Sequence, residues 1–220
     1  MPKKYYWEND KAHGNYGYNF RCTPKGIPGW KVRQLNYLFK FIESQFALQP
    51  KKPLKCLDIG CNAALNLVFF DEQYYNKNNE YVGFDINKTA LGLAKENLKE
   101  KNATLTKANL ATKDVLSKYD DNHFDFAFAT WALAHIPKKR QKTKLIKDIV
   151  RVSKNGIFYE AYDPKEFDCI GKSFIVEDEN DNTNVVVYDD YRVYDSIIKL
   201  QERTNTDLGN SSGLFWWNKS

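Results

Sequence analysis

The sequence has no long hydrophobic run. None of its apolar stretches approaches the roughly 18 to 20 residues that a membrane-spanning helix requires, because Asn, Asp or Lys interrupts each within a few positions. The N-terminal stretch 1–20 has two early lysines but no apolar segment after them, so it does not fit a secretion signal. We therefore expect a soluble, cytoplasmic protein with no membrane partner.

Cysteine is scarce, and its spacing fits no common metal or redox motif. The cysteines are Cys22, Cys56, Cys61 and Cys169. Their separations match neither the spacing of zinc ligands nor a CxxC pair, so we expect free thiols and no metal site. Cys56 and Cys169 are expected to fill core positions as small apolar residues.

Aromatic residues, in contrast, are abundant. The 220 residues include 14 Phe, 14 Tyr and 5 Trp, and 42% of the chain is hydrophobic. Extended disorder is excluded, because disordered chains combine high charge with few aromatic residues. The chain has enough apolar material for one core, and we expect a single structural domain.

The net charge of +5 is unevenly distributed along the chain. Residues 1–55 contain eleven Lys and Arg against three acidic residues, a net charge of +8, which leaves −3 for the rest. This asymmetry indicates either an anionic partner near the N-terminal segment or a solvated basic face.

Hydrophobic periodicity predicts alternating strands and helices. The stretch 28–46, for example, spaces Leu35, Leu38 and Ile42 as in an amphipathic helix. The expected strands are 54–60, 81–84, 103–108, 124–129 and 157–161, and the expected helices are 28–46, 64–75, 87–101 and 138–153, the last ended by Gly156. Such alternation predicts a parallel sheet with helices on both faces.

The C-terminal part of the sequence follows a different pattern. The stretches 173–178, 184–189 and 214–217 have the composition of strands, and a helix is expected near 191–202. We expect these strands to form an antiparallel edge of the sheet.

The turn after the first strand, residues 58–64, carries the main chemical signal. Ligands of open parallel sheets bind at the carboxyl ends of the strands, and this turn is the first of them. It has a single glycine, Gly60, preceded by Asp58, whereas a dinucleotide site would require GxGxxG. An acid at this point suits a cationic group such as an ammonium better than a pyrophosphate, so a dehydrogenase is a weak alternative.

This turn resembles the first motif of class I S-adenosylmethionine-dependent methyltransferases, LD-x-G-C-G-x-G. Four positions match, namely Leu57, Asp58, Gly60 and Cys61. Asn62 and Ala64 replace the second and third glycines, and Asn is the non-glycine residue that best tolerates positive φ.

Further landmarks of the same family follow in order. Asp85 matches the acid that accepts the ribose hydroxyls, Asn109 and Leu110 stand where the family contacts adenine, and 124–137 and 151–161 resemble the two later motifs. The resemblance implies a Rossmann-like, seven-stranded, mostly parallel α/β sheet that binds S-adenosyl-L-methionine. The expected cofactor-binding residues are Asp58, Gly60, Cys61, Asn62, Asp85, Ile86, Asn109, Leu110, Thr130 and Trp131.

A narrower resemblance lies upstream. The stretch 13–20, HGNYGYNF, together with LDIGCN, is similar to the RNA 5′-phosphate methyltransferase family. The alternative is a Tyr-rich lid over the cofactor, and we expect 1–50 to form a lid and first helix and 51–220 the methyltransferase domain. The expected substrate residues are Tyr16, Tyr18, Arg21 and Arg33, and the candidate bases are His135 and His13, while His123 is expected in a turn.

Three functions fit these observations. The first is methyl transfer to a small-molecule acceptor, expected to be an O-methyl transfer to a sugar or phosphorylated metabolite, with an anionic acceptor placed by cations and needing no base. The second is methylation of RNA, with the basic N-terminal segment and the basic helix 138–154 as a phosphate track. The third is a catalytically inactive subunit that keeps the cofactor-binding fold.

Overall fold

The computed structural model describes residues 29–49, 52–112, 114–162, 173–177, 183–201 and 212–219. The expected lid residues His13, Tyr16, Tyr18 and Arg21 lie outside these ranges, as do Cys22 and Cys169. No helix within the described ranges combines the length and apolar character needed to cross a membrane.

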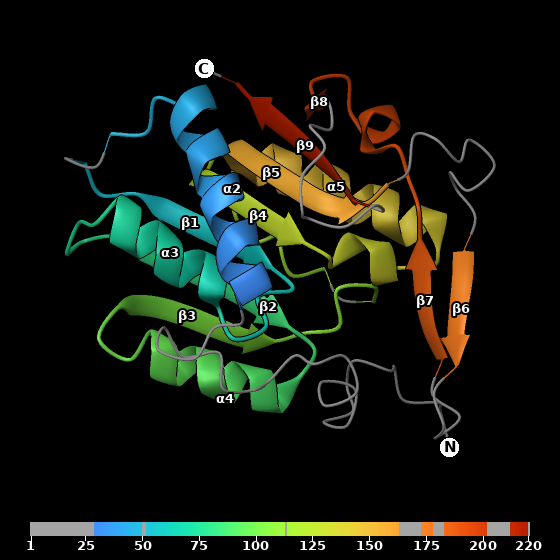
Figure 1. Cartoon of the computed structure of the whole chain (residues 1–220), viewed down its shortest axis with the longest axis horizontal. Helices are drawn as coiled ribbons and strands as arrows, with labels where there is room; N and C mark the ends of the chain where they lie inside the picture. The colour runs from blue at the N-terminus through green and yellow to red at the C-terminus, as the bar shows by residue number, and fades with distance from the viewer. Residues whose placement is uncertain are drawn as a thin grey trace.

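A seven-stranded sheet forms the centre of the molecule (Figure 1). Its strand order is β3-β2-β1-β4-β5-β9-β8. The strands are β1 Lys55–Ile59, β2 Glu80–Asp85, β3 Asn102–Lys107, β4 Phe124–Thr130, β5 Ser153–Ala161, β8 Lys199–Gln201 and β9 Ser212–Asn218. The first five are parallel, and β9 runs antiparallel to both β5 and β8. The predicted Rossmann-like, mostly parallel sheet with an antiparallel edge is confirmed.

Helices cover both faces of this sheet. In Figure 1, α2 Gly29–Gln45, α3 Leu65–Gln73 and α4 Lys88–Asn97 lie on the near face, and α5 Lys139–Val152 lies behind. Phe126 and Phe128 of β4 are buried in the core with α2 and α3, while Ala127 and Ala129 are buried in the core with α5. Both faces of β4 are therefore buried, which explains its nearly continuous apolar sequence.

The predicted helix start at Asn87 is confirmed by its capping geometry. Asn87 Oδ1 accepts a hydrogen bond from the Ala90 backbone N–H at 2.8 Å. The prediction that Gly156 ends the following helix is wrong, because α5 ends at Val152 and Gly156 lies within β5. A Cβ at Gly156 would lie 2.3 Å from the indole of Trp217 on β9, so the glycine makes room for that ring.

The C-terminal elements differ from the prediction in two ways. The strands β6 Ser173–Glu177 and β7 Thr183–Val187 form a separate two-stranded antiparallel sheet, and the antiparallel edge is made by β9 and β8. The expected helix near 191–202 is replaced by the short 3-10 helix η4, Tyr191–Tyr194, and by β8. Asp190 caps η4 by accepting from the Arg192 N–H, whereas Asp195, which ends η4, accepts from the Ile197 N–H in a turn that competes with continuing the helix.

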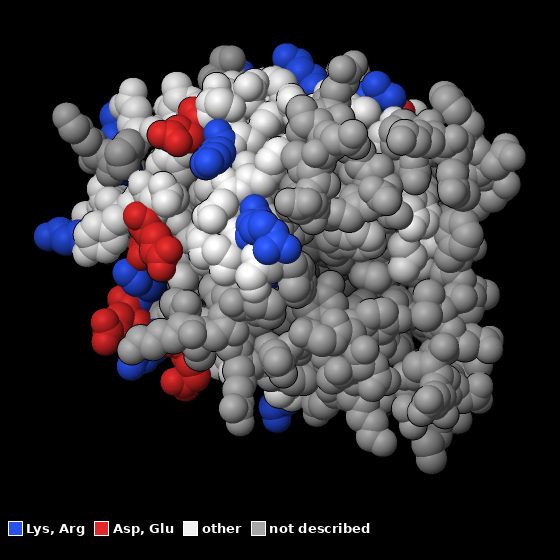
Figure 2. Space-filling view, in the orientation of Figure 1, with Lys and Arg blue, Asp and Glu red and all other residues white. Residues whose placement is uncertain are grey.

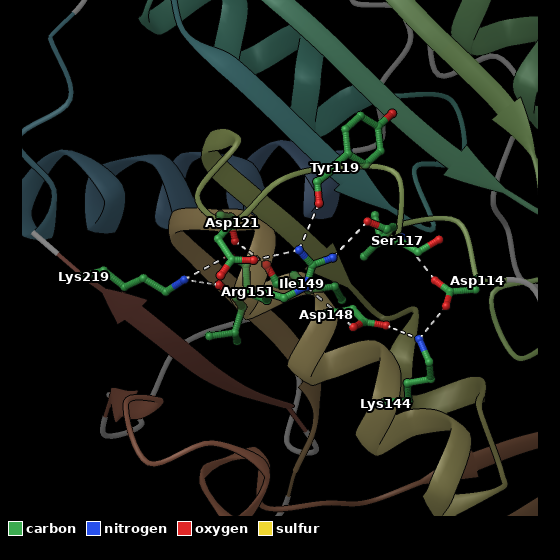
Figure 3. A network of polar contacts seen from close by, with 12 residues as sticks. Asp114, Ser117, Tyr119, Asp121, Lys144, Asp148, Ile149, Arg151 and Lys219 are labelled. Atoms are coloured by element: carbon green, nitrogen blue, oxygen red, sulfur yellow. Dashed lines mark hydrogen bonds and ion pairs between the residues drawn. The ribbon is translucent and has the colours of Figure 1, made fainter.

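Figure 3 shows the polar network that fixes the connection between β3 and β4. The guanidinium of Arg151 donates to the carbonyls of Leu116 and Tyr119 at 3.1 and 2.9 Å and to Asp121 at 2.8 Å. Lys144 of α5 forms ion pairs with Asp114 of the connection and with Asp148, which also lies on α5. The connection is thus attached to α5 near the amino end of β4.

Candidate active site

The turn after β1 has a left-handed backbone at three positions. The φ angles are 70° at Gly60, 49° at Asn62 and 59° at Ala64. A Cβ at Gly60 would lie 2.5 Å from the Cβ of Ala132, so this position requires glycine for space as well as conformation. The expectation that Asn62 adopts positive φ is confirmed, and Ala64 adopts the strained conformation where the resembled motif has its last glycine.

Four backbone N–H groups of this turn, those of Gly60, Cys61, Asn62 and Ala64, donate to acceptors within the protein. Gly60 and Cys61 both donate to the carbonyl of Phe84, at 2.8 and 3.0 Å, and Asn62 donates to Asp85 Oδ2 at 2.9 Å. A turn whose amides are occupied in this way does not form the anion-binding nest that a pyrophosphate requires. The hydrogen-bonding groups left for a ligand at this turn are carbonyl and carboxylate oxygens. Such acceptors fit an ammonium group and ribose hydroxyls.

Asp85 ends β2 and holds two neighbouring segments. Its Oδ1 accepts from the Asn87 N–H at 2.8 Å, while Oδ2 accepts from Asn62 on the first turn. Burial raises the pKa of Asp85, and the backbone N–H groups of Asn87, Asn62 and Ile86 oppose this shift. Because each carboxylate oxygen has two lone pairs, both oxygens can also accept a ligand hydroxyl.

Asp58 is fully buried at the end of β1. Asn66 of α3 donates from Nδ2 to both of its carboxylate oxygens, each at 3.2 Å, and to Thr130 Oγ1 at 3.1 Å. Burial raises the pKa of Asp58 to about 7, with the Asn66 hydrogen bond and the charge of Lys31 acting in the opposite direction. The sequence analysis missed Asn66, although a buried Asn within the apolar run 65–70 is a usable signal.

The turn after β4 is held by a second buried carboxylate, Glu160 of β5. Its oxygens accept from three consecutive N–H groups, those of Ala132 and Leu133 at 3.0 Å and that of Ala134 at 3.1 Å. Burial raises the pKa of Glu160 to about 7, while these hydrogen bonds oppose the shift. The carboxylate thereby fixes the 3-10 helix η2, Leu133–His135. Sequence reasoning missed Glu160, an acid inside a buried strand.

The fold brings most of the predicted cofactor residues to one edge of the sheet. β1 lies between β2 and β4, so their carboxyl ends bring together Asp58, Gly60, Cys61, Asn62, Asp85, Ile86, Thr130 and Trp131. Half-buried His135 ends η2 at this edge. Asn109 and Leu110 follow β3, and Asn109 Oδ1 accepts from the Ala111 N–H at 3.0 Å.

Arg33 and His123 are the other candidate residues of the sequence that fall within the described ranges. Arg33 is exposed on α2. His123 lies in a turn, as predicted, and contacts the rings of Tyr119 and Phe124 just before β4 begins, at the opposite end of that strand from the cluster.

Comparison with known proteins agrees with this geometry. Residues 56–156 match the family described as a methyltransferase domain. A protein from Pyrococcus horikoshii OT3 has a similar structure, with TM-score 0.61, 18% identity and coverage of 93% of this chain and 98% of that one. No curated protein matches this chain in sequence.

Two more solved structures share the fold. An S-adenosylmethionine-dependent methyltransferase from Methanosarcina mazei has TM-score 0.58 and 19% identity, with coverage of 81% of this chain and 96% of that one. The N-terminal domain of EvdMO1, crystallised in the presence of S-adenosylhomocysteine and D-fucose, has TM-score 0.58 and 14% identity, with coverage of 84% and 82%.

Proposed function

We propose that this chain, whose residues 56–156 match the methyltransferase domain family, is a class I methyltransferase that uses S-adenosyl-L-methionine to methylate a small molecule, by O-methyl transfer to a sugar or phosphorylated metabolite. The observation that carries the cofactor part of the proposal is the turn after β1. Its amides are occupied, and Asp58 and Asp85 flank it with acceptors for a cation and for hydroxyls.

The proposed cofactor contacts follow from the chemistry of these groups. Asp85 accepts the ribose hydroxyls, and Asp58 with the backbone of Gly60, Cys61 and Asn62 faces the amino-acid end. The remaining contacts are assigned to Ile86 and, following the family resemblance, to Asn109, Leu110, Thr130 and Trp131. When bound, S-adenosylmethionine supplies a methyl group made electrophilic by the sulfonium.

The protein has to position the acceptor, exclude water and remove a proton where the acceptor is neutral. His135 is the proposed base, since η2 places it at the same edge of the sheet as Asp58 and Thr130. For a hydroxyl acceptor, its imidazole takes the hydroxyl proton as the oxygen accepts the methyl group. Glu160 supports this role by fixing the backbone of η2, and His13 is the second candidate.

A small acceptor is supported by what lies beside η2. Strand β7 contacts η2, and Figure 1 shows the β6–β7 hairpin at the end of the sheet toward which β4 and β5 point. The hairpin therefore lies beside the 3-10 helix that carries His135, and we propose that it limits the size of the acceptor. The EvdMO1 domain, crystallised with a monosaccharide, shares the fold, which supports a sugar as the class of acceptor to test first. Tyr16, Tyr18, Arg21 and Arg33 are the proposed substrate residues, and the two arginines would place an anionic acceptor.

RNA is a weaker candidate because half of the basic side chains in the stretch 138–154 are paired with aspartates. Four of the eight basic residues form ion pairs with aspartates: Lys142 with Asp189, Lys144 with Asp114 and Asp148, Arg151 with Asp121, and Lys154 with Asp125. Lys142 is only 1% exposed, so it cannot reach a phosphate. Figure 2 shows the face of the molecule opposite α5, where basic and acidic side chains are interspersed among the described residues.

The test is formation of S-adenosylhomocysteine by the purified chain with S-adenosylmethionine and one acceptor class at a time. Monosaccharides, sugar phosphates and a 5′-phosphorylated RNA oligonucleotide form the three arms. Turnover with either small-molecule class is the expected result. Turnover with RNA alone would overturn the proposed acceptor, and cofactor binding without turnover in any arm would favour an inactive subunit.

A further inference from the structure

Asn66 joins the ends of two neighbouring strands. It is 5% exposed, on the side of α3 that faces the sheet, in a run of apolar residues. Its amide nitrogen lies 3.2 Å from each carboxylate oxygen of Asp58 on β1 and 3.1 Å from Thr130 Oγ1 on β4. Both partners belong to the proposed cofactor site, whereas Asn66 itself lies beneath it in α3.

The hydrogen-bond inventory of the Asn66 amide fixes its orientation. The NH₂ group has two hydrogens, one shared by the two oxygens of Asp58 and the other directed to Thr130. Rotating the amide by half a turn would place its oxygen next to the Asp58 carboxylate. Two acceptors would then face each other without a hydrogen bond between them. Asn66 Oδ1 is buried and makes no hydrogen bond among the described residues, so the contacts to Asp58 and Thr130 decide the orientation.

These contacts determine the state of both partners. Donation from Nδ2 favours the charged form of Asp58. Thr130 Oγ1 accepts from Asn66, so its own hydroxyl hydrogen points away from Asn66. Asn66 thus presents an acceptor on β1 and a donor on β4 at the same edge of the sheet.

Few charges face Asp58 from the surrounding elements. Lys31 acts on it from α2, and Asp85 acts on it from the end of β2. The thiols of Cys56 and Cys61 are also near, and their raised pKa values keep them neutral. Within the described ranges no side chain forms an ion pair with Asp58, so its direct partner is the neutral Asn66.

We infer that Asn66 is a positioning residue of the cofactor site, which holds Asp58 and Thr130 together and sets the pH range over which the ionisation of Asp58 changes cofactor affinity. The inference rests on the proposed function, because it needs the cationic end of the cofactor to face Asp58. The ammonium of S-adenosylhomocysteine has the same charge, and this ligand binds without reacting.

The sign of the pH dependence follows from linkage. Burial raises the pKa of Asp58 to about 7, so the unliganded protein holds a proton there below neutral pH. A cationic ligand favours the charged carboxylate and expels that proton, so affinity rises with pH. One such group predicts an affinity about tenfold higher at pH 8 than at pH 6.

Removing the Asn66 amide raises the midpoint of this dependence. Asn66→Leu removes a donor to a charged group, a loss that corresponds to an upward shift of about one pH unit. Asn66→Asp keeps the shape but places a second carboxyl beside Asp58, which shifts the midpoint in the same direction. Asn97→Ala is the matched control, because Asn97 donates to the Ala63 carbonyl of the same turn at 2.8 Å without contacting Asp58.

The experiment is calorimetric titration of the full chain with S-adenosylhomocysteine between pH 5.5 and 8.5, with thermal unfolding of each variant as a check of folding. We expect a midpoint near pH 7 for the unmodified protein and for Asn97→Ala, and a higher midpoint for whichever Asn66 variant folds. Equal midpoints in all proteins, or binding independent of pH, would overturn this inference alone. Absence of binding by the unmodified protein at every pH would overturn the proposed function itself.

Discussion

Gly60 and Ala132 meet across the carboxyl ends of β1 and β4. A Cβ at Gly60 would lie 2.5 Å from the Ala132 Cβ, and Gly60 has φ 70°. Ala132 in turn donates its N–H to Glu160, which fixes its position from β5. The two turns that line the proposed site are therefore fitted to each other, and a change in either one displaces the other.

Gly60→Ala tests this fit. We expect it to lower the free energy of unfolding by about 2 to 4 kcal/mol, because the new methyl combines a steric clash with a left-handed backbone. Affinity for S-adenosylhomocysteine should fall as well. Gly92→Ala is the matched control, since a Cβ at this exposed α4 position meets no atom within 4 Å, and it should stabilise the protein by about 0.5 to 1 kcal/mol. Equal stability of the two variants in urea unfolding would contradict the account.

Glu160 predicts a dependence of stability on pH. Its pKa rises from 4.5 unfolded to about 7 in the folded protein, so the stability contributed by its protonated form is fully present below pH 4.5 and lost as pH rises toward 7. The loss is about 3 kcal/mol for a shift of this size. Glu160→Gln, which cannot ionise, should flatten this part of the profile measured by urea unfolding between pH 4.5 and 7.5. A profile of unchanged slope would show that Glu160 does not titrate there.

The buried ion pair of Lys142 with Asp189 tests how the segment after β7 is attached to α5. Nζ lies 2.7 Å from Oδ2 of Asp189, which also accepts from the hydroxyl of Tyr194 at 3.0 Å. Asp189→Ala leaves a buried ammonium without its partner and should cost about 3 to 5 kcal/mol. Lys142→Met combined with Asp189→Ala should recover much of that loss, and an additive double-mutant cycle would argue against a direct pair.

Substitution of Arg151 tests whether stability can change while cofactor affinity does not. The contacts of this residue fix the β3–β4 connection near the amino end of β4 (Figure 3). The proposed site lies at the opposite, carboxyl end of that strand. Arg151→Ala should lower the free energy of unfolding by about 2 kcal/mol, because two carbonyls and Asp121 lose a charged donor. Affinity for S-adenosylhomocysteine measured on the folded variant should be unchanged. A large loss of affinity would mean that this network reaches the site.

The sequence predicted the parts of the fold that depend on local periodicity. The alternating strands and helices up to Ala161 follow from the spacing of apolar residues within each segment. The cap at Asn87 follows from the chemistry of the Asn side chain. The end of α5 could not be predicted in the same way. Gly156 was expected to end the helix, but it lies in β5 and makes room for the indole of Trp217, which is more than 60 positions away in the sequence. The expected helix near 191–202 ends after one short 3-10 turn because of the turn at Asp195, which hydrophobic periodicity does not indicate.

In the candidate site, too, some residues could be predicted from the local sequence and others could not. Asp58, Gly60 and Asp85 follow strands, and parallel strands place their carboxyl ends together. Asn66 and Glu160 act from within a helix and a strand, and their partners Asp58, Thr130 and Ala132 are brought to them by the sheet order. Only the arrangement of β1, β4 and β5 shows that these buried polar residues hold the site.

Titration of S-adenosylhomocysteine into the unmodified chain, Asp85→Ala and Asp114→Ala tests the central claim most directly. Asp114 is an exposed aspartate paired with Lys144, so Asp114→Ala controls for loss of a carboxylate elsewhere. We predict binding with one-to-one stoichiometry, weakened by about 1.5 to 3 kcal/mol in Asp85→Ala and unchanged in Asp114→Ala. Absence of binding by the unmodified chain, or equal affinity of Asp85→Ala, would contradict the assignment of this edge of the sheet as the cofactor site.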